Sequence, residues 1–460
     1  MRFIVSNCIR VTDPDSSVKE WCKHNLVIDN PEYIKKTRLG KWTGNVPREI
    51  FLYEKTGNEL RIPFGCFKRI YMNYRSFPFE ADFGSLERVL YNSGIKLYDY
   101  QENAVKEALR ARNGIIVMPC GSGKTQTALE LVNRIGGRCL WLTHTQDLLN
   151  QSKTRAEACF NLPYAEYGTI TGGKVNIGKI TFATVQTMCK LDLNQYRYAF
   201  DIIIVDECHK CVGSPTHVMQ FYKVLSSLSC RYKFGLTATP RRADGLEKSM
   251  FALLGDIVVE VPKHVVEQMT CPVEVKQIET GYMPDLDVVL AGDGTINYAS
   301  LVEDTTHNEE RLEKVLDIIN GLPAEDPVLV LANRVEYLEK LNERYSGKSL
   351  CLSKMGNSKR AKQERRESLM NLNDGKLNCI FATYQLAKEG LDVPNLRYVV
   401  FATPEKDETT IIQASGRVGR KADGKKKGVI IDFVDSFGMY RGWAKKRLGF
   451  YKKLGMKMVE

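Results

Sequence analysis

Two series of short apolar runs, separated by segments of helical length, are the strongest constraint on how this chain can fold. The first series is GIIVM (114–118), RCLWLT (138–143), KITFAT (179–184), DIIIVD (201–206) and KFGLTAT (233–239). The second is PVLVLAN (327–333), SLCLS (349–353), LNCIFAT (377–383), RYVVFAT (397–403) and KGVIIDFVD (427–435). Strands buried on both faces are apolar throughout, and parallel neighbours need a crossover between them. The sequence therefore predicts an α/β protein with two tandem parallel-sheet lobes.

The rest of the chain divides around these two lobes. EIFLYEKTGNELRIPFGCF (49–67) has the pattern of two strands joined by a turn at Thr-Gly-Asn. We therefore expect a small β-rich or α+β accessory module at the N-terminus. The expected divisions are the module (1–88), the first lobe (89–260), an inter-lobe segment (261–307), the second lobe (308–440) and a basic C-terminal helix (441–460).

Composition agrees with a multidomain globular protein in a reducing compartment. A chain of 460 residues with 43% hydrophobic and 26% charged residues is expected to form two or three domains. No apolar run approaches the roughly 20 residues that a membrane span needs, and we expect a cytoplasmic protein. The 13 cysteines are scattered, which favours free thiols. Cys208 and Cys211 lack a second pair at zinc-site spacing, so a metal site there is disfavoured.

The net charge of +11 is concentrated near the C-terminus. Residues 417–427 hold six Lys/Arg against one Asp, and residues 441–460 hold seven Lys/Arg against one Glu. Such a concentration suggests a polyanionic partner. A solvated helix face is an equally good interpretation of the charge alone.

MPCGSGKTQ, between an apolar run and a helical segment, has the context of a phosphate-binding loop. Gly121, Ser122 and Gly123 would wrap phosphates with main-chain N–H groups, Lys124 would neutralise phosphate oxygens, and Thr125 would hold Mg²⁺. The strict pattern has glycine where Met118 stands, outside the tight part of the cradle. The alternative is a glycine turn that only caps a helix.

Asp206 and Glu207 follow the apolar residues IIIV directly. They are expected at the carboxyl end of a buried strand, where open α/β sheets bind ligands. Asp206 would order the Mg²⁺ shell and Glu207 would polarise an attacking water. Taken alone, the pair could also be a helix cap.

At this point the motifs resemble those of superfamily-two helicases. DECHK is similar to the DEAH-type box, LTATPRRADG (236–245) to the motif that follows it, and YDYQ (98–101) to the adenine-contacting element with Gln101. ATYQLAKEGLDVPNL (382–396) and QASGRVGR (413–420) resemble the fifth and sixth motifs. The motifs and the strand pattern cover about four fifths of the chain.

The resemblance implies two RecA-like lobes that use ATP and Mg²⁺. It implies a phosphate-facing role for Gln413, Arg417 and Arg420, because an arginine stabilises the charge that develops on the γ-phosphate. Gly390 and Asp392 correspond to phosphate- and ribose-contacting positions. His209, Thr237 and Thr239 correspond to residues that couple hydrolysis to movement.

The same resemblance implies a nucleic-acid track, held through the sugar–phosphate backbone without reading sequence. The candidate contacts are Thr143, Gln151, Gly172, Gly173, Thr184, Gln186 and Thr383. The basic C-terminal helix, with Trp443, Phe450 and Tyr451 interleaved, would grip a duplex or junction, or pack its aromatic face on the second lobe.

The DECHK and TATPRRADG motifs resemble the branch with Xeroderma-pigmentosum-B type helicases, restriction-enzyme motors and phage UvsW-type branch-migration helicases. The compact length favours the last, so we expect a monomeric motor that remodels forked or four-way DNA. Three alternatives stay open: an RNA helicase, the motor subunit of a restriction-type nuclease complex, and an ATP-dependent switch that is not a motor.

Overall fold

The computed structural model describes residues 1–119, 121–211, 215–240, 246–262, 264–265, 271–356, 359–388, 391 and 393–459. The chain forms two compact units. The first contains Met1–Pro119 and Gly123–Pro262, and the second contains Cys120–Ser122 and Lys263–Glu460.

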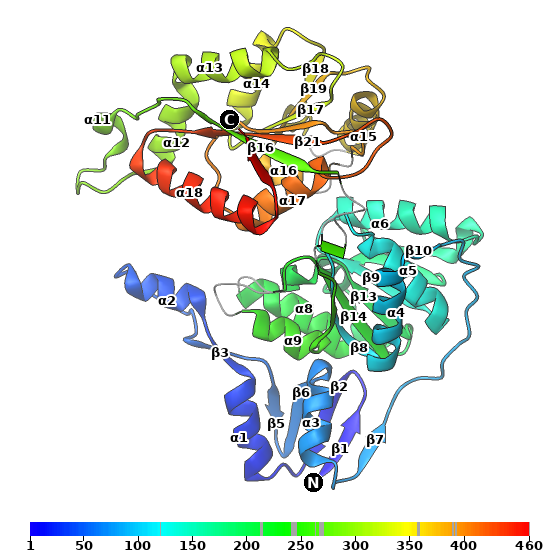
Figure 1. The fold of residues 1–460 in the computed structure, drawn as a ribbon. Coiled ribbons are helices and arrows are strands. Elements are labelled where there is room, and N and C mark those ends of the chain that lie inside the picture. Colours follow the sequence, from blue (N-terminus) through cyan, green and yellow to red (C-terminus); the bar gives the residue numbers. More distant parts are fainter. Residues whose placement is uncertain are drawn as a thin grey trace. The chain divides into compact units, whose positions relative to one another are not determined.

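The N-terminal module of the first unit is built on a five-stranded sheet of order β5-β6-β2-β1-β7 (Figure 1). The predicted hairpin is present, because Thr56 pairs with Glu59 across a turn in which Gly57 has φ +57°. The strands are β1 (Arg2–Val5), β2 (Cys8–Thr12), β5 (Glu54–Thr56), β6 (Glu59–Pro63) and β7 (Phe79–Ala81), and the helices are α1 (Ser16–Asn25) and α3 (Phe67–Tyr74). A two-stranded ribbon, β3 (Val27–Asp29) with β4 (Glu49–Phe51), carries α2 (Pro31–Arg38) between its strands.

The module packs against the α/β part of the first unit and shares a hydrophobic core with it. A Cβ at Gly65 would lie 2.4 Å from the main-chain nitrogen of Gly255, so the two backbones touch. The buried Lys233 ammonium donates to the carbonyl oxygens of Leu225 at 2.7 Å and of Asn7 in the module at 3.2 Å. Module and α/β part therefore fold as one body.

The first unit's main sheet has the order β11-β10-β12-β9-β13-β14-β8-β15, and its pairings are parallel except that of β10 with β11. Figure 1 shows α4 and α5 on one side of the sheet and α8 and α9 on the other. The strands are β8 (Asn113–Val117), β9 (Cys139–Thr143), β10 (Tyr167–Thr171), β11 (Lys174–Asn176), β12 (Ile180–Thr184), β13 (Ile202–Val205), β14 (Tyr232–Thr237) and β15 (Ile257–Glu260). The helices are α4 (Asp99–Ala111), α5 (Lys124–Ile135), α6 (Gln146–Cys159), α7 (Val185–Met188), α8 (Pro215–Ser227) and α9 (Glu247–Leu254).

The second unit's sheet is parallel throughout, in the order β18-β19-β17-β20-β21-β16-β22. The strands are β16 (Val273–Glu279), β17 (Val328–Ala332), β18 (Ser349–Cys351), β19 (Cys379–Thr383), β20 (Tyr398–Phe401), β21 (Gly428–Val434) and β22 (Lys457–Val459). The helices are α11 (Leu286–Val289), α12 (Tyr298–His307), α13 (Glu309–Asn320), α14 (Val335–Arg344), α15 (Lys359–Asn373), α16 (Tyr384–Lys388), α17 (Glu408–Val418) and α18 (Gly438–Lys453). Short 3₁₀ turns in the two units are η1 (Phe64–Cys66), η2 (Tyr164–Glu166), η3 (Leu193–Tyr196), η4 (Cys208–Cys211) and η5 (Leu352–Lys354).

All ten apolar runs singled out in the sequence are strands, which confirms the predicted fold of two parallel-sheet lobes. Two further strands of the second sheet lie in segments that the sequence did not place in a sheet. β16 lies within the 261–307 segment expected to link the lobes, and it pairs with β21 over seven residues. β22 follows α18 and extends the sheet beyond β16.

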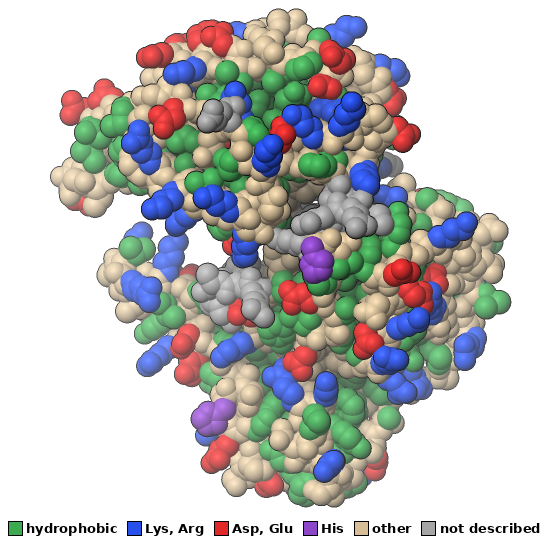
Figure 2. All heavy atoms as spheres, in the orientation of Figure 1, with side chains coloured by type: hydrophobic (Ala, Val, Ile, Leu, Met, Phe, Trp, Pro, Cys, Tyr) green, Lys and Arg blue, Asp and Glu red, His purple; other side chains and the backbone are tan. Residues whose placement is uncertain are grey.

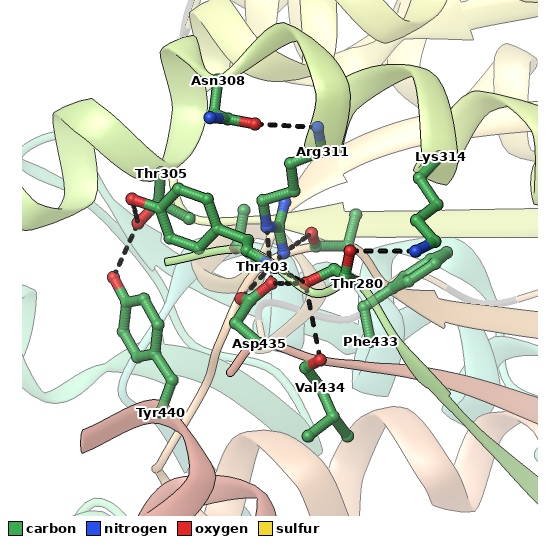
Figure 3. A network of polar contacts seen from close by, with 12 residues as sticks. Thr280, Thr305, Asn308, Arg311, Lys314, Thr403, Phe433, Val434, Asp435 and Tyr440 are labelled. Atoms are coloured by element: carbon green, nitrogen blue, oxygen red, sulfur yellow. Dashed lines mark hydrogen bonds and ion pairs between the residues drawn. The ribbon is translucent and has the colours of Figure 1, made fainter. Parts of the chain in front are cut away.

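A buried ion pair joins α13 to the end of β21 in the second unit (Figure 3). The Arg311 guanidinium donates to both carboxylate oxygens of Asp435, at 2.8 and 3.2 Å, and both side chains are fully buried. It also donates to the Tyr337 hydroxyl at 2.9 Å and to the carbonyl oxygen of Ala402 at 2.8 Å. These bonds fasten α13 and α14 to the sheet.

Among the helices in the described ranges, none is long and apolar enough to cross a membrane.

Replacing Asp435 by Asn should destabilise the second unit, because the isosteric amide leaves the buried Arg311 charge uncompensated. Removing one partner of a buried ion pair costs about 3–5 kcal/mol of unfolding free energy. Urea unfolding of the full chain measures it. The matched control is Glu309→Gln. Glu309 lies on α13, as Arg311 does, and its exposed ion pair with Arg344 of α14 can be broken with the unfolding midpoint nearly unchanged. Equal midpoints for both variants would contradict the structural role of the buried pair.

Candidate functional site

The carboxyl ends of the parallel strands in the first unit meet at one edge of the sheet, and most of the predicted site residues follow them there. Open α/β sheets bind ligands at this edge because the loops that leave the strands converge on it. In sheet order the edge carries Gly172 and Gly173 after β10, Thr184 at the end of β12, Thr143 at the end of β9, Asp206 and Glu207 after β13, Thr237 at the end of β14, and the MPCGSGKTQ loop after β8.

The glycine loop after β8 leads into the N-terminus of α5, as the sequence predicted. Gly121 and Gly123 adopt the left-handed region, with φ of +81° and +77°, which a residue with a Cβ rarely does. Gly123 caps α5 and makes no side-chain hydrogen bond to its first turn; a helix N-terminus of this kind suits an anion. The Lys124 Nζ lies 3.5 Å from the carbonyl oxygens of Met118 and Pro119 and so bends over the loop. Thr125 is the second residue of the helix.

Gln101 lies against this loop. Its Oε1 accepts a hydrogen bond from the Tyr98 N–H at 3.0 Å at the start of α4. A Cβ at Gly123 would lie only 2.4 Å from the Gln101 Nε2, so the glutamine amide lies directly against the glycine that φ requires there. The YDYQ element and the glycine loop, predicted separately, are therefore neighbours.

Asp206 is buried, Glu207 beside it is half-buried, and the charge of Lys124 acts on both carboxylates. Burial and the adjacent Glu207 charge raise the pKa of Asp206 to about 6. Burial opposes ionisation of Glu207 too, but Lys124 and a hydrogen bond with His209 outweigh it and lower its pKa to about 2. Two carboxylates with such different proton affinities suit different roles. Asp206 also accepts from the Ser152 hydroxyl at 3.2 Å.

His209 links the acidic pair to β14. Its Nδ1 lies 3.2 Å from the Glu207 Oε2 and 3.1 Å from the Thr237 Oγ1. The Thr237 hydroxyl also accepts from the Thr239 N–H at 3.0 Å. The three residues expected to couple hydrolysis to movement are thus connected to one another and to Glu207.

The remaining candidates in the first unit lie further along the same edge. Thr143 and Thr184 are paired across β9 and β12, and the Gln186 Nε2 donates to the carbonyl oxygen of His144 at 3.2 Å. The Thr143 hydroxyl donates to the carbonyl oxygen of Thr145, and the Thr184 hydroxyl accepts from the Thr187 N–H. Gly172 and Gly173, both with positive φ, form the exposed two-residue turn between β10 and β11, and Gln151 lies on α6.

The second unit carries the other candidates. Gln413 and Arg417 are one helical turn apart on α17, and Arg420 follows the helix by two residues. The Arg417 guanidinium is mostly buried and donates to the carbonyl oxygens of Ala387, at 2.6 Å, and of Leu391. Thr383 ends β19 and accepts from the Leu386 N–H at 3.3 Å. Gly390 and Asp392 lie outside the described residues.

The basic C-terminal helix α18 has two faces. Tyr440, Trp443, Arg447 and Tyr451 are buried, and Arg447 pairs with the buried Asp432 of β21 at 2.8 Å. Arg441, Lys445, Lys446, Lys452 and Lys453 are exposed. Tyr440 and Trp443 therefore pack with Val289 of α11 and Leu301 of α12, Tyr451 joins the core of the second sheet, and the basic face meets solvent.

Sequence reasoning missed Ser152, whose hydroxyl orders the Asp206 carboxylate. The one available signal was its place with Leu149 and Ala156 on the buried stripe of α6, where a polar side chain requires a partner. A serine on such a stripe is too common to identify a site from one sequence.

Comparison with known proteins agrees with this arrangement. The family model for the res subunit of type III restriction enzymes matches residues 94–242, and the model for the conserved helicase C-terminal domain matches residues 310–422. The DNA 3′-5′ translocase XPB2 of Sulfurisphaera tokodaii is 26% identical over 384 residues, 76% of this chain and 84% of that protein.

A solved structure extends the comparison to the fold. The helicase domain of Hef from Pyrococcus furiosus is 17% identical, with a TM-score of 0.51, over 75% of this chain and 97% of that one. T4 UvsW is 20% identical over 100% of this chain and 99% of that one, with a TM-score of 0.42. The two family models fall in order on the two parallel-sheet units, which confirms the resemblance seen in the motifs. The chain belongs to the superfamily-two helicases: it has two RecA-like domains and is a nucleic-acid-dependent ATPase.

Proposed function

We propose that this protein is an ATP-dependent DNA translocase that remodels branched DNA, moving forks or four-way junctions during replication, recombination or repair. The observation that carries the proposal is the shared carboxyl edge of the first sheet. It holds the phosphate loop and acidic pair at one end and the exposed Gly172–Gly173 turn at the other. A shift of residues at the phosphate loop on ATP hydrolysis could be transmitted to the Gly172–Gly173 turn through the few strand ends between them.

ATP would bind with its base at Gln101 and its phosphates over the loop and the N-terminus of α5. The loop fits this ligand, because its left-handed glycines and its helix N-terminus suit an anion. Thr125 and Asp206 would hold Mg²⁺, which neutralises charge on the phosphates. Glu207, kept ionised by Lys124 and His209, would orient and polarise the attacking water.

The second unit would supply Arg420 to the γ-phosphate and Gln413 to the water. Arg417 has its guanidinium bonded to the Ala387 and Leu391 carbonyl oxygens, so we assign it to positioning α17. ATP hydrolysis would then need residues from both units. Its rate would therefore depend on the nucleic acid that the two units bind.

DNA as the track is supported by the similarity to XPB2, a DNA 3′-5′ translocase, and by the DECHK and TATPRRADG motifs. Preference for branched substrates and a monomeric state rest on the resemblance to UvsW-type helicases. The exposed basic face of α18 is a suitable duplex contact because it carries five cations and no carboxylate.

Lys124→Ala should abolish ATP hydrolysis, because the loop loses the cation that neutralises phosphate charge. Steady-state ATPase with saturating DNA should fall at least about 100-fold, while the circular dichroism spectrum is unchanged. Lys106→Ala, which removes an exposed lysine on α4, is the matched control and should turn over normally. Near-normal hydrolysis by the Lys124 variant would refute the assignment of the phosphate loop.

The substrate is tested by ATPase rates at one fixed salt concentration with different nucleic acids. The panel is no nucleic acid, single-stranded RNA, single-stranded DNA, duplex DNA, a fork and a four-way junction. We expect the fork or junction to stimulate most, because only these offer the duplex and single-strand contacts together. Stimulation by RNA alone would make the protein an RNA helicase, and a flat response would remove the motor function.

A further inference from the structure

The connection between β3 and β4 is far longer than an antiparallel pair needs. Adjacent antiparallel strands are usually joined by two to five residues, whereas residues 30–48 lie between these two. Figure 1 shows α2 standing away from the module's sheet on this connection. We call residues 30–48 the arm. Long insertions that add no core are usually functional, and none of the residues of α2 is buried.

The base of the arm is fixed to the module by Asn30, which is fully buried. Its Nδ2 donates to the carbonyl oxygen of Pro47 at 2.8 Å, and its N–H donates to that of Arg48 at 2.9 Å. Its Oδ1 accepts from the Glu32 N–H at 3.0 Å and so caps α2. One side chain thus clamps both ends of the arm and starts its helix.

The far end of α2 is fixed by a Schellman motif. The Lys41 N–H donates to the carbonyl oxygen of Lys36 at 2.9 Å, and the Gly40 N–H donates to that of Thr37 at 3.1 Å. Gly40 has φ +62°, the left-handed conformation that this motif requires. The motif turns the chain sharply and presents Lys41 and Trp42 at a defined place.

Trp42 is the most exposed large apolar residue in the described part of the chain, with 87% of its surface accessible. Its ring lies across Gly44, since a Cβ there would be 3.0 Å from an indole carbon. Gly44 has φ +54°, so glycine at this position allows the left-handed turn and leaves room for the indole ring. An indole supported from one side and open on the other is a platform for a stacking partner.

The arm is also strongly basic. It holds five Lys/Arg against one Glu, and Glu32 is paired with Lys36. Lys35, Arg38, Lys41 and Arg48 are exposed and make no ion pair with any residue that the structure describes. Figure 2 shows Lys and Arg side chains on this part of the surface. Cations around an accessible aromatic ring suit a nucleic acid, because the cations can bind phosphates while the ring stacks on a base.

We propose that the arm binds single-stranded DNA, with Trp42 stacked on an unpaired base and the four exposed cations on the flanking phosphates. This inference rests on the proposed function, since it takes DNA as the track. A base offers its face only where it is unpaired, so the arm selects the single-stranded part of a fork or junction. Because the module is packed into the first unit's core, the arm moves with the ATP-binding domain.

Tryptophan fluorescence tests the stacking contact. The chain has four tryptophans. Trp141 is fully buried, Trp443 is 9% exposed and Trp21 is half-buried against the core of the module, whereas Trp42 is 87% exposed, so quenching by oligo-dT should come mainly from Trp42. We expect oligo-dT to quench the wild type and not Trp42→Phe. Trp42→Ala should weaken oligo-dT binding about fivefold or more, and Trp42→Phe should bind nearly as the wild type, because phenylalanine also stacks.

Salt dependence tests the cations. The arm variant K35Q/R38Q/K41Q/R48Q should lower the slope of log affinity against log salt by about 0.7 for each phosphate that the arm no longer neutralises. The control K19Q/K23Q/K55Q/K68Q removes the same charge from exposed positions elsewhere in the module and should keep the slope. All substitutions are at exposed positions, so circular dichroism should be unchanged.

The proposal is overturned if Trp42→Ala and the arm variant both bind oligo-dT as tightly as the wild type does. The basic arm would then be a contact for an acidic protein. The proposed function would stand in that case if forks still stimulate the wild-type ATPase. A wild type that neither binds oligo-dT nor responds to any DNA would overturn both. The two failures are therefore distinct.

Discussion

The carboxyl ends of parallel strands at one edge of the first sheet are the constraint on which the rest of the protein depends. A helix or turn must leave each strand there, so main-chain N–H groups and short polar side chains collect at that edge. The phosphate loop, Asp206 and Glu207, and Thr237 follow adjacent strands β8, β13 and β14. Their closeness follows from the order of the strands. It also makes the adjacent carboxylates of buried Asp206 and half-buried Glu207 tolerable, because the Lys124 charge acts on both.

Much of this was predictable from the sequence, because continuous apolar runs and glycine motifs are local signals. The order of strands in the sheet was not, since register and neighbours come from tertiary packing. β16 and β22 were not recognised as second-sheet strands because VEVKQIE alternates with charge and KMV is too short to carry a pattern. The hydrogen bonds of the buried Arg417 could not be predicted either. The sequence around an arginine is the same whether its guanidinium binds a phosphate or a carbonyl oxygen.

The second unit illustrates how one segment can carry both stability and a proposed function. Arg447 and Tyr451 of α18 are buried in the sheet, while five cations of the same helix face solvent. Truncating the basic tail would remove a buried ion pair and a strand along with those cations. Its proposed contribution to DNA binding is therefore separable from folding only by substitutions on the exposed face.

Hydrolysis of ATP held by the first unit is proposed to require an arginine of the second. This dependence is measured by comparing ATP binding and single-turnover hydrolysis in the wild type and Arg420→Ala with saturating fork DNA. We expect nearly unchanged ATP affinity and a hydrolysis rate reduced by about 10³-fold, because the arginine acts on charge that develops in the transition state. Lost ATP binding with normal hydrolysis of the bound fraction would contradict the two-unit mechanism.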